Sequence, residues 1–408
     1  MSTPAPPSAP TASADLTRRL AVPIWLLVFI TLSGTLGMHM FVPALPLAAR
    51  ELGTSAGEMQ LTISLYIAGL GAGQLFYGPL SDAYGRRPLL LSGLALYTAA
   101  GLVAALSSGV HALIAARLLQ ALGGCAGLVL GRAIVSDTAH ADDALRKLAL
   151  LNLMTLLGPG LAPLAGAFIG THAGWRSIFF LLATLGALAF VCTARLLPET
   201  ARPSGRLSTG KLLRDYGTLL RSPVFSGFAF GGGCSTTAFY AFLAAGPFVF
   251  ADQLHRPTTE LGFYLALLVV GVSVGNFSAA RLARRFSGDT VLMGANLLSL
   301  ASAVTLLSVA VAGYLSVASV MGAMFLFMVG AGAVGPIALA RAISVDPRLT
   351  GSAAGLYGFA QMSVGALCTA MVSLGTDPAI ASGVVLTLMA VVARINFTMA
   401  NRRSARAG

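Results

Sequence analysis

Two side chains with distinctive chemistry lie inside long apolar stretches of this 408-residue sequence. Arg117 stands among leucine and isoleucine neighbours, and His39 falls in the first apolar run. A guanidinium placed in lipid is costly, so Arg117 is expected to face a cavity or a partner. The alternative is an anchor that donates hydrogen bonds to carbonyls of a neighbouring helix. Gln120 follows about one turn later and shares the same helix face.

The placement of the acidic residues limits which groups could carry a proton within the membrane. All fourteen Asp and Glu residues fall at the ends of apolar stretches, in loops or in the N-terminal tail. Proton relays within a membrane need an acid or a histidine. This leaves His39, because an imidazole titrates near neutral pH. We predict proton coupling through His39; the alternative is a neutral histidine that hydrogen-bonds to its substrate or to a neighbour.

Enzyme chemistry is not indicated. The four cysteines lie in apolar runs without a CxxC or Cys/His pair, which argues against zinc sites and disulfides. Gly330–Gly335 fits GxGxxG but lies inside an apolar stretch, where close helix packing explains it better than a dinucleotide site. The sequence has no GxxxxGK[ST] motif and no Ser/His/Asp arrangement. We therefore predict that the protein is not an enzyme and binds neither metal nor cofactor.

The elements that position these residues are predicted to be membrane-spanning helices. Apolar residues make up 56% of the chain and charged residues only 10%, against about 25% in soluble domains. The mean hydropathy is +0.82. A bilayer needs about 20 apolar residues per helix. Twelve stretches fit: 22–46, 58–80, 88–107, 111–135, 147–170, 176–197, 223–250, 259–282, 289–312, 315–341, 351–374 and 379–401.

The twelve stretches divide into two similar halves. The longest connector, 198–222, separates six stretches from six, and GPLSDAYGRR at Gly78 has a counterpart, GNFSAARLARR, at Gly275. Two such halves are the repeat architecture of secondary transporters. The predicted organisation is a disordered cytoplasmic tail, a first half, a cytoplasmic linker, a second half and a C-terminal tail, over residues 1–20, 21–197, 198–222, 223–401 and 402–408.

Basic residues predict the orientation. Of the 26 Lys and Arg residues, only Arg50, Arg176 and Arg256 fall on one side, and Arg117 lies within a span. Cytoplasmic loops carry the excess of positive charge, so both termini are predicted to be cytoplasmic. This placement explains the net charge of +12 without nucleic acid. Only Lys147 and Lys211 are lysines, a bias that suggests a GC-rich bacterial genome and hence a bacterial cytoplasmic membrane.

Several segments resemble one family of transporters. Gly73–Pro88, GQLFYGPLSDAYGRRP, resembles the loop motif of the major facilitator superfamily, and Arg117–Gly124 resembles its fourth-span motif. Leu156–Gly170 is similar to the fifth-span motif of its drug:proton antiporters. Phe41–Pro46 and Gly351–Leu367 resemble the Bcr/CflA-type drug-resistance branch. The likeness covers about residues 20–400. It implies an all-α membrane fold of twelve helices in two pseudo-symmetric halves.

The loop motif is expected to form a cytoplasmic gate. Gly78 and Gly85 are predicted to make tight turns. The resemblance implies that Asp82 faces the start of the eleventh span, near Gly351, and that the motif arginine meets Asp137. Ala83 stands where the family has arginine, which removes one contact. The alternative is a topology signal alone. The predicted gate consists of Gly78, Asp82, Gly85, Arg86, Arg87 and Asp137.

The fifth-span motif is expected to be a bent, closely packed helix between the halves. Glycine allows close helix approach, and proline bends a helix. Its residues are Gly158, Pro159, Gly160, Pro163 and Gly166. Such a helix could act as a hinge, although glycine and proline are also common in membrane helices.

The resemblance places a substrate site between the halves. It implies central roles for His39, Arg117 and Gln120 in proton coupling or substrate binding, with His39 where related sequences have an acid. The candidate cavity residues, each of which could instead serve packing, are Phe41, Tyr66, Asn152, Tyr240, Gln361 and Met362. An apolar cavity suits lipophilic compounds, with neutral and anionic ones favoured over cations.

The predicted function is export of lipophilic toxic compounds, such as drugs, in exchange for protons. The protein is expected to work as a monomer in the lipid bilayer, with the proton gradient as its energy source. The alternatives are a metabolite exporter or facilitator of the same fold, or a membrane receptor or scaffold.

Overall fold

The computed structural model of the protein describes residues 22–138, 141–201, 203, 205, 209–346 and 349–407. The described chain is helical, and each of the twelve predicted stretches coincides with a helix or a group of consecutive helices. The first half contains α2 (Ile24–His39), the 3₁₀ turn η1 (Val42–Ala44), α3 (Leu45–Leu52), α4 (Ala56–Tyr84), α5 (Arg86–Ala105), α6 (Val110–Thr138), α7 (Ala141–Ala173) and α8 (Trp175–Leu196).

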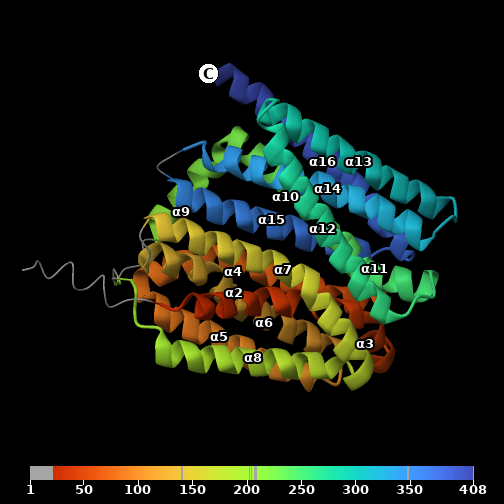
Figure 1. Ribbon diagram of the computed structural model, residues 1–408, viewed down its shortest axis with the longest axis horizontal. Coiled ribbons are helices and arrows are strands. Elements are labelled where there is room, and N and C mark those ends of the chain that lie inside the picture. The colour runs from red at the N-terminus through yellow and green to blue at the C-terminus, as the bar shows by residue number, and fades with distance from the viewer. Residues whose placement is uncertain are drawn as a thin grey trace, which may run out of the picture.

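The second half follows a linker that holds one further helix, α9 (Thr209–Arg221). It contains α10 (Pro223–Thr236), α11 (Phe239–Phe248), the π-helical turn η2 (Val249–Gln253), α12 (Thr258–Leu282), α13 (Gly288–Val311), α14 (Val317–Ile343), α15 (Thr350–Ser373) and α16 (Pro378–Ala407). Figure 1 shows the halves side by side, with α2–α8 in red to yellow-green and α10–α16 in green to blue.

The helices have the length and composition of membrane spans. Ten helices or groups of consecutive helices in the described chain are long and apolar enough to cross a bilayer. The two remaining long helices, α4 and α7, lie at the interface between the halves, where they pack against α15 and α12. Protein neighbours cover these two helices, so they can carry more polar residues and glycine than a lipid-facing helix.

The bundle has two ends, which we call the linker end and the Arg50 end. The linker end carries α9 and the loop Asp82–Arg87; the Arg50 end carries α3 and the turn η2. Basic residues follow this division. Arg86, Arg221 and Arg341 are among the many at the linker end, whereas Arg50, Arg176 and Arg256 lie at the Arg50 end.

The structure corrects three details of the sequence prediction. Gly78 lies inside α4 rather than in a turn, and the turn is made by Gly85, whose φ is +102°. The connector 198–222 contains the amphipathic helix α9, because its leucines and Tyr216 recur at helical spacing. Residues 402–407, expected as a tail, continue α16. The predicted tail 1–20 lies outside the described residues.

Candidate transport site

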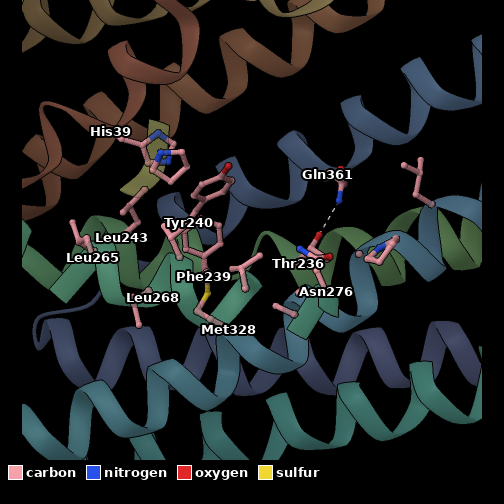
Figure 2. Close-up of a pocket in the computed structure, with 18 of the residues that line it drawn as sticks. His39, Thr236, Phe239, Tyr240, Leu243, Leu265, Leu268, Asn276, Met328 and Gln361 are labelled. Carbon is pink, nitrogen blue, oxygen red and sulfur yellow. Dashed lines mark hydrogen bonds between the residues drawn. The ribbon is translucent and has the colours of Figure 1, made fainter. Parts of the chain in front are cut away.

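A cavity of about 520 Å³ lies between the two halves. Only His39, Arg132 and Pro159 come from the first half, and α10, α11, α12, α14 and α15 supply the remaining described lining residues. Figure 2 shows His39 across the cavity from Phe239, Tyr240 and Met328. Most of the wall is apolar, from residues such as Leu265. This volume and lining suit a small lipophilic molecule.

The polar part of the wall lies where the seventh span is broken. The chain leaves α10 at Thr236 and re-enters a helix at Phe239. Gln361 of α15 donates from Nε2 to Thr236 Oγ1 at 2.8 Å, and Thr237 Oγ1 donates to the Gln361 carbonyl at 2.9 Å. These bonds satisfy groups at the helix break, so Gln361 fixes the shape of the cavity as well as lining it.

One ring nitrogen of His39 is buried beside the cavity without a partner among the described residues. Its Nδ1 lies 2.9 Å from the Thr35 carbonyl, which can only accept, so Nδ1 carries the hydrogen. Nε2 therefore holds the lone pair, and no described residue lies within hydrogen-bonding distance of it. The side chain is 3% exposed and lines the cavity. The lone pair of this nitrogen can accept a proton or a hydrogen bond from a donor that reaches it.

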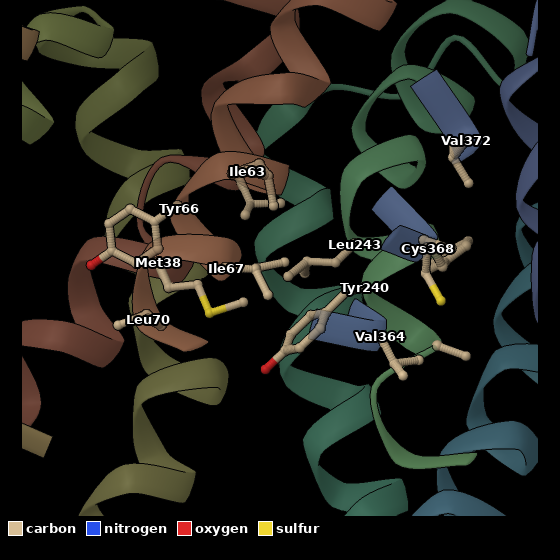
Figure 3. Close-up of a cluster of buried hydrophobic side chains, with 14 of the residues drawn as sticks. Met38, Ile63, Tyr66, Ile67, Leu70, Tyr240, Leu243, Val364, Cys368 and Val372 are labelled. Carbon is tan, nitrogen blue, oxygen red and sulfur yellow. The ribbon is translucent and has the colours of Figure 1, made fainter. Parts of the chain in front are cut away.

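An apolar contact layer closes the cavity toward the Arg50 end. Met38 and Ile67 of the first half meet Tyr240 and Leu243 of the second, and all four are buried (Figure 3). We call these four residues the plug. Beyond it, Arg50 Nη2 lies 3.0 Å from Asp252 Oδ1 of the other half. Toward the linker end, α6 and α14 are not in extensive contact, and the cavity lining continues to Arg132 and Leu339. The cavity thus opens at the linker end.

Arg117 and Gln120 do not line this cavity. Arg117 is fully buried within the first half, where Nη1 donates to the Gly37 carbonyl at 2.7 Å and to Gln120 Oε1 at 2.8 Å. The guanidinium carbon lies 3.9 Å from the centre of the Tyr66 ring, with Phe41 and Phe179 at 5.7 and 5.6 Å. In this conformation Arg117 makes the contacts of an anchor to a neighbouring helix and is enclosed by aromatic rings.

The other predicted cavity residues divide between the cavity and its surroundings. Tyr240 and Gln361 line the cavity. Phe41 and Tyr66 surround Arg117, and the Tyr66 hydroxyl donates to the Gly34 carbonyl at 2.9 Å. Met362 packs where α15 approaches Gly71 of α4. The side chain of Asn152 lies outside the described residues.

The gate motif is held together within the first half. Arg86 Nη1 lies 2.6 Å from Asp82 Oδ1, and Arg86 Nε lies 2.9 Å from Asp137 Oδ2. Arg87 donates to the Ala194 carbonyl at 2.8 Å. The side chain of Asp82 is 66% exposed and does not reach the start of α15. The expected contact with Gly351 is therefore wrong for this conformation, because the halves are apart at the linker end.

Glu199, which the sequence prediction missed, completes this motif. Its carboxylate accepts hydrogen bonds from the backbone nitrogens of Arg86 at 2.8 Å and Arg87 at 3.2 Å. It thereby caps the N-terminus of α5, where a negative charge is favoured. Gly85 leaves the space that the carboxylate needs, since a Cβ there would lie 2.5 Å from Glu199 Oε2. The Pro198-Glu199 sequence at the end of a span was the available signal.

The linker helix α9 contacts both halves. Leu219 is buried against the second half, and the Tyr216 hydroxyl lies 3.5 Å from the Leu75 carbonyl of α4. Burial raises the pKa of Tyr216, with nearby Asp215 as a smaller cause, so the hydroxyl stays protonated and can donate. The linker helix therefore bridges the halves at the open end of the cavity.

The fifth-span motif lies at the interface between the halves. A Cβ at Gly158 would lie 2.9 Å from Thr35 Cβ, and one at Gly166 would overlap the Met40 carbonyl. The other side of α7 faces α12, where a Cβ at Gly262 would lie 3.1 Å from the Pro163 carbonyl. Gly160 faces Val269 of α12, and Pro159 lines the cavity. The glycines thus allow α7 to pack tightly between α2 and α12.

Comparison with known proteins identifies the architecture. The sequence profile of the Major Facilitator Superfamily matches residues 27–369. Two solved structures share the fold. A D-xylose-proton symporter has a TM-score of 0.70 and 16% identity, covering 91% of this chain and 96% of its own. A bacterial homologue of the human lysosomal transporter Spinster, in an inward-facing and unoccupied conformation, has a TM-score of 0.71 and 14% identity, covering 97% of this chain and 98% of its own.

Sequence relatives include proteins named for drug resistance. Multidrug resistance protein D of Escherichia coli (strain K12) is 30% identical over 90% of this chain and 92% of its own length. A chloramphenicol resistance protein of Pseudomonas aeruginosa is 33% identical over 81% of this chain and 76% of its own length. An uncharacterized transporter of Bacillus subtilis (strain 168) is 30% identical over 93% of this chain and 95% of its own length.

Proposed function

The chain belongs to the major facilitator superfamily, and from this premise we propose that it exports small lipophilic compounds from the cytoplasm in exchange for protons. Membership makes it a multi-pass membrane transporter of small molecules rather than an enzyme. Transporters of this superfamily use ion gradients and need no cofactor. The direction, the substrate class and the coupling ion are the proposal.

The orientation rests on the basic residues. The linker end carries most of the arginines, and the excess of positive charge marks the cytoplasmic side. With the linker end in the cytoplasm of a bacterium, the cavity opens inward and the plug closes the outer side. This is the state in which an exporter takes up its substrate.

The substrate class rests on the cavity. Its wall is mainly apolar and offers a few polar groups, among them Asn276 and Gln361. The names of the E. coli and Pseudomonas relatives point to the same kind of compound. The cavity between the halves is the observation that carries the proposal, because it combines this wall with a nitrogen that can take up a proton.

The coupling proposal rests on His39. When the cavity faces outward, Nε2 would accept a proton from the external side. When it faces inward, the proton would be released to the cytoplasm as the substrate enters. Among the described lining residues, His39 is the only histidine, and the lining holds neither Asp nor Glu, so His39 is the candidate proton carrier. We propose that the protein does this as a monomer in the bacterial cytoplasmic membrane.

The test is transport into everted membrane vesicles of a bacterium that lacks its own pumps. We expect the full chain to accumulate several lipophilic drugs when the interior is acidic and to release protons as each drug is added. His39→Asn keeps an N–H near the Thr35 carbonyl but cannot titrate, so it should lose the drug-dependent proton movement.

Matched membrane abundance of the two proteins is the control. Drug-dependent proton movement that persists in His39→Asn would assign coupling elsewhere in the chain. A wild-type chain that moves no drug of the panel, and confers no resistance, would contradict lipophilic export itself.

A further inference from the structure

Arg132 is a charged residue of the cavity, which the sequence prediction counted only among the basic residues that set the orientation in the membrane. It lies on α6, fifteen residues beyond Arg117, or about 22 Å further along the helix. This places it six residues before the linker end of α6 at Thr138. The side chain is exposed and lines the cavity. Arg132 therefore stands at the mouth through which a substrate enters.

This arginine differs from the other arginines near the halves' interface in having no partner. Arg86 is paired with Asp137, Arg50 with Asp252, and Arg341 lies 2.5 Å from Asp289. Arg132 makes no hydrogen bond and no salt bridge with any residue that the structure describes. Its five N–H donors are therefore available to a molecule in the cavity.

The surrounding wall does not neutralise this charge. The described lining contains neither Asp nor Glu, so Arg132 gives the cavity a positive potential. Apolar walls formed by Leu265, Val272 and Met328 lower the local dielectric and strengthen that potential. A cation is repelled from this cavity, and an anion is attracted to its mouth.

A second unpartnered group lies deeper in the same cavity. His39 lines the cavity and is 3% exposed, and its buried Nε2 has no partner among the described residues. The cavity thus offers a guanidinium at the mouth, apolar walls in the middle and one buried nitrogen at the closed end. These features match a molecule with an apolar body and a single carboxylate.

We propose that Arg132 is the anion-binding residue of this site and that the preferred substrates are amphipathic carboxylates. The inference rests on the proposed export function and narrows its substrate class. Arginine can hold a carboxylate through two parallel hydrogen bonds, which a neutral amide of the same shape cannot replace. The apolar body of the substrate lies against α12 and α14.

The experiment compares two probes that share one body, 1-naphthylacetate and 1-naphthylacetamide. Equilibrium dialysis measures their binding to the purified full-length protein at pH 7. We expect the carboxylate to bind on the order of tenfold or more tightly than the amide, in line with one charge-assisted hydrogen-bond pair. Added salt should weaken the binding of the carboxylate and leave that of the amide unchanged.

Three variants assign the preference to Arg132. Arg132→Gln should lower the affinity for the carboxylate to that for the amide, whereas Arg132→Lys, which keeps the charge but not the paired hydrogen bonds, should retain only part of the preference. Arg284→Gln removes a charge from the same end of the bundle outside the cavity lining, so it should leave both affinities unchanged.

Several results would overturn the assignment. Equal loss of both affinities in Arg132→Gln would mean that Arg132 shapes the mouth without binding the anion. Absence of a carboxylate preference in the wild type would also reject it. Export of neutral drugs is measured separately in the everted vesicles, so a chain that pumps those drugs but ignores the charge of the naphthyl probes overturns this inference alone.

Discussion

At the residue scale, Arg117 is held by groups that carry no formal negative charge. The Gly37 carbonyl and Gln120 accept from Nη1, and the Tyr66 ring lies against the guanidinium plane. Carbonyl dipoles and ring faces can stabilise a cation out of water only when they surround it closely. The arginine therefore ties α6 to α2 and α4, and its loss would leave buried acceptors unpaired.

Replacement of Arg117 should lower stability more than substrate affinity. For Arg117→Ala we expect a loss of about 3 kcal/mol, because a buried, hydrogen-bonded side chain is removed and a cavity remains. Arg117→Lys should not restore the stability, since an ammonium cannot stack on Tyr66. Thermal unfolding in detergent measures both variants, with exposed Arg403→Ala as the control. Wild-type melting combined with lost drug binding would contradict this role.

Burial of Arg117 was predictable from the sequence, but its location was not. Because Arg117 has apolar neighbours in the sequence, it must contact either a protein partner or a cavity, and the sequence is consistent with both. Only the packing of α2, α4 and α5 decides which face of α6 meets protein and which meets the cavity. The same limit hid Arg132, which lies within the predicted span 111–135 but near its end.

At the scale of elements, the start of α5 depends on a contact from the end of the first half. Glu199 accepts from the backbone nitrogens of Arg86, Arg87, Thr200 and Ala201. A helix leaves its first N–H groups without partners, and a carboxylate satisfies them while complementing the positive end of the helix. The loop motif is thus held in place by a residue more than 100 positions away.

Glu199→Ala should loosen the first turn of α5 by about 1 kcal/mol, the usual value of a helix cap. Faster hydrogen exchange of the Arg86 and Arg87 amides would report this change. Asp377 caps the unrelated helix α16 through the Ile380 nitrogen, so exchange there should stay the same. Unchanged exchange at both sites would show that the cap contributes nothing to the order of the loop.

The helices themselves were largely predictable, and their internal breaks were not. Apolar length alone locates twelve spans, because lipid requires every backbone group to be bonded within its own helix. At the break between α10 and α11, the Thr236 hydroxyl accepts from the Gln361 side chain of α15 and the Thr237 hydroxyl donates to the Gln361 carbonyl, contacts across more than 120 residues. No local pattern in the sequence specifies such a partner.

At the scale of the whole molecule, two kinds of contact close the Arg50 end. The plug buries apolar side chains of both halves, and the Arg50–Asp252 pair joins exposed charges. Burial of a leucine side chain is worth about 2 kcal/mol, whereas an exposed ion pair contributes at most about 1 kcal/mol. The plug therefore determines how often this end opens.

Truncation of the plug should shift the conformational equilibrium more than loss of the ion pair. We expect Leu243→Ala to raise the population open at the Arg50 end roughly 30-fold, and Arg50→Ala to raise it less than about fivefold. Spin labels on α3 and at residue 254, in a background without the native cysteines, would measure the two populations. The reverse order of effects would assign closure to the ion pair.

The uneven origin of the cavity wall has a consequence for how such a transporter can diversify. Among the described lining residues, all but His39, Arg132 and Pro159 belong to the second half. Under the proposals above, the second half contacts the apolar body of the substrate, and the first half supplies Arg132 for its charge and His39 for the proton. Recombination at the linker should therefore exchange the apolar wall alone, so a hybrid of two related transporters should resemble its C-terminal parent in the shape of the compounds it accepts and its N-terminal parent in their charge.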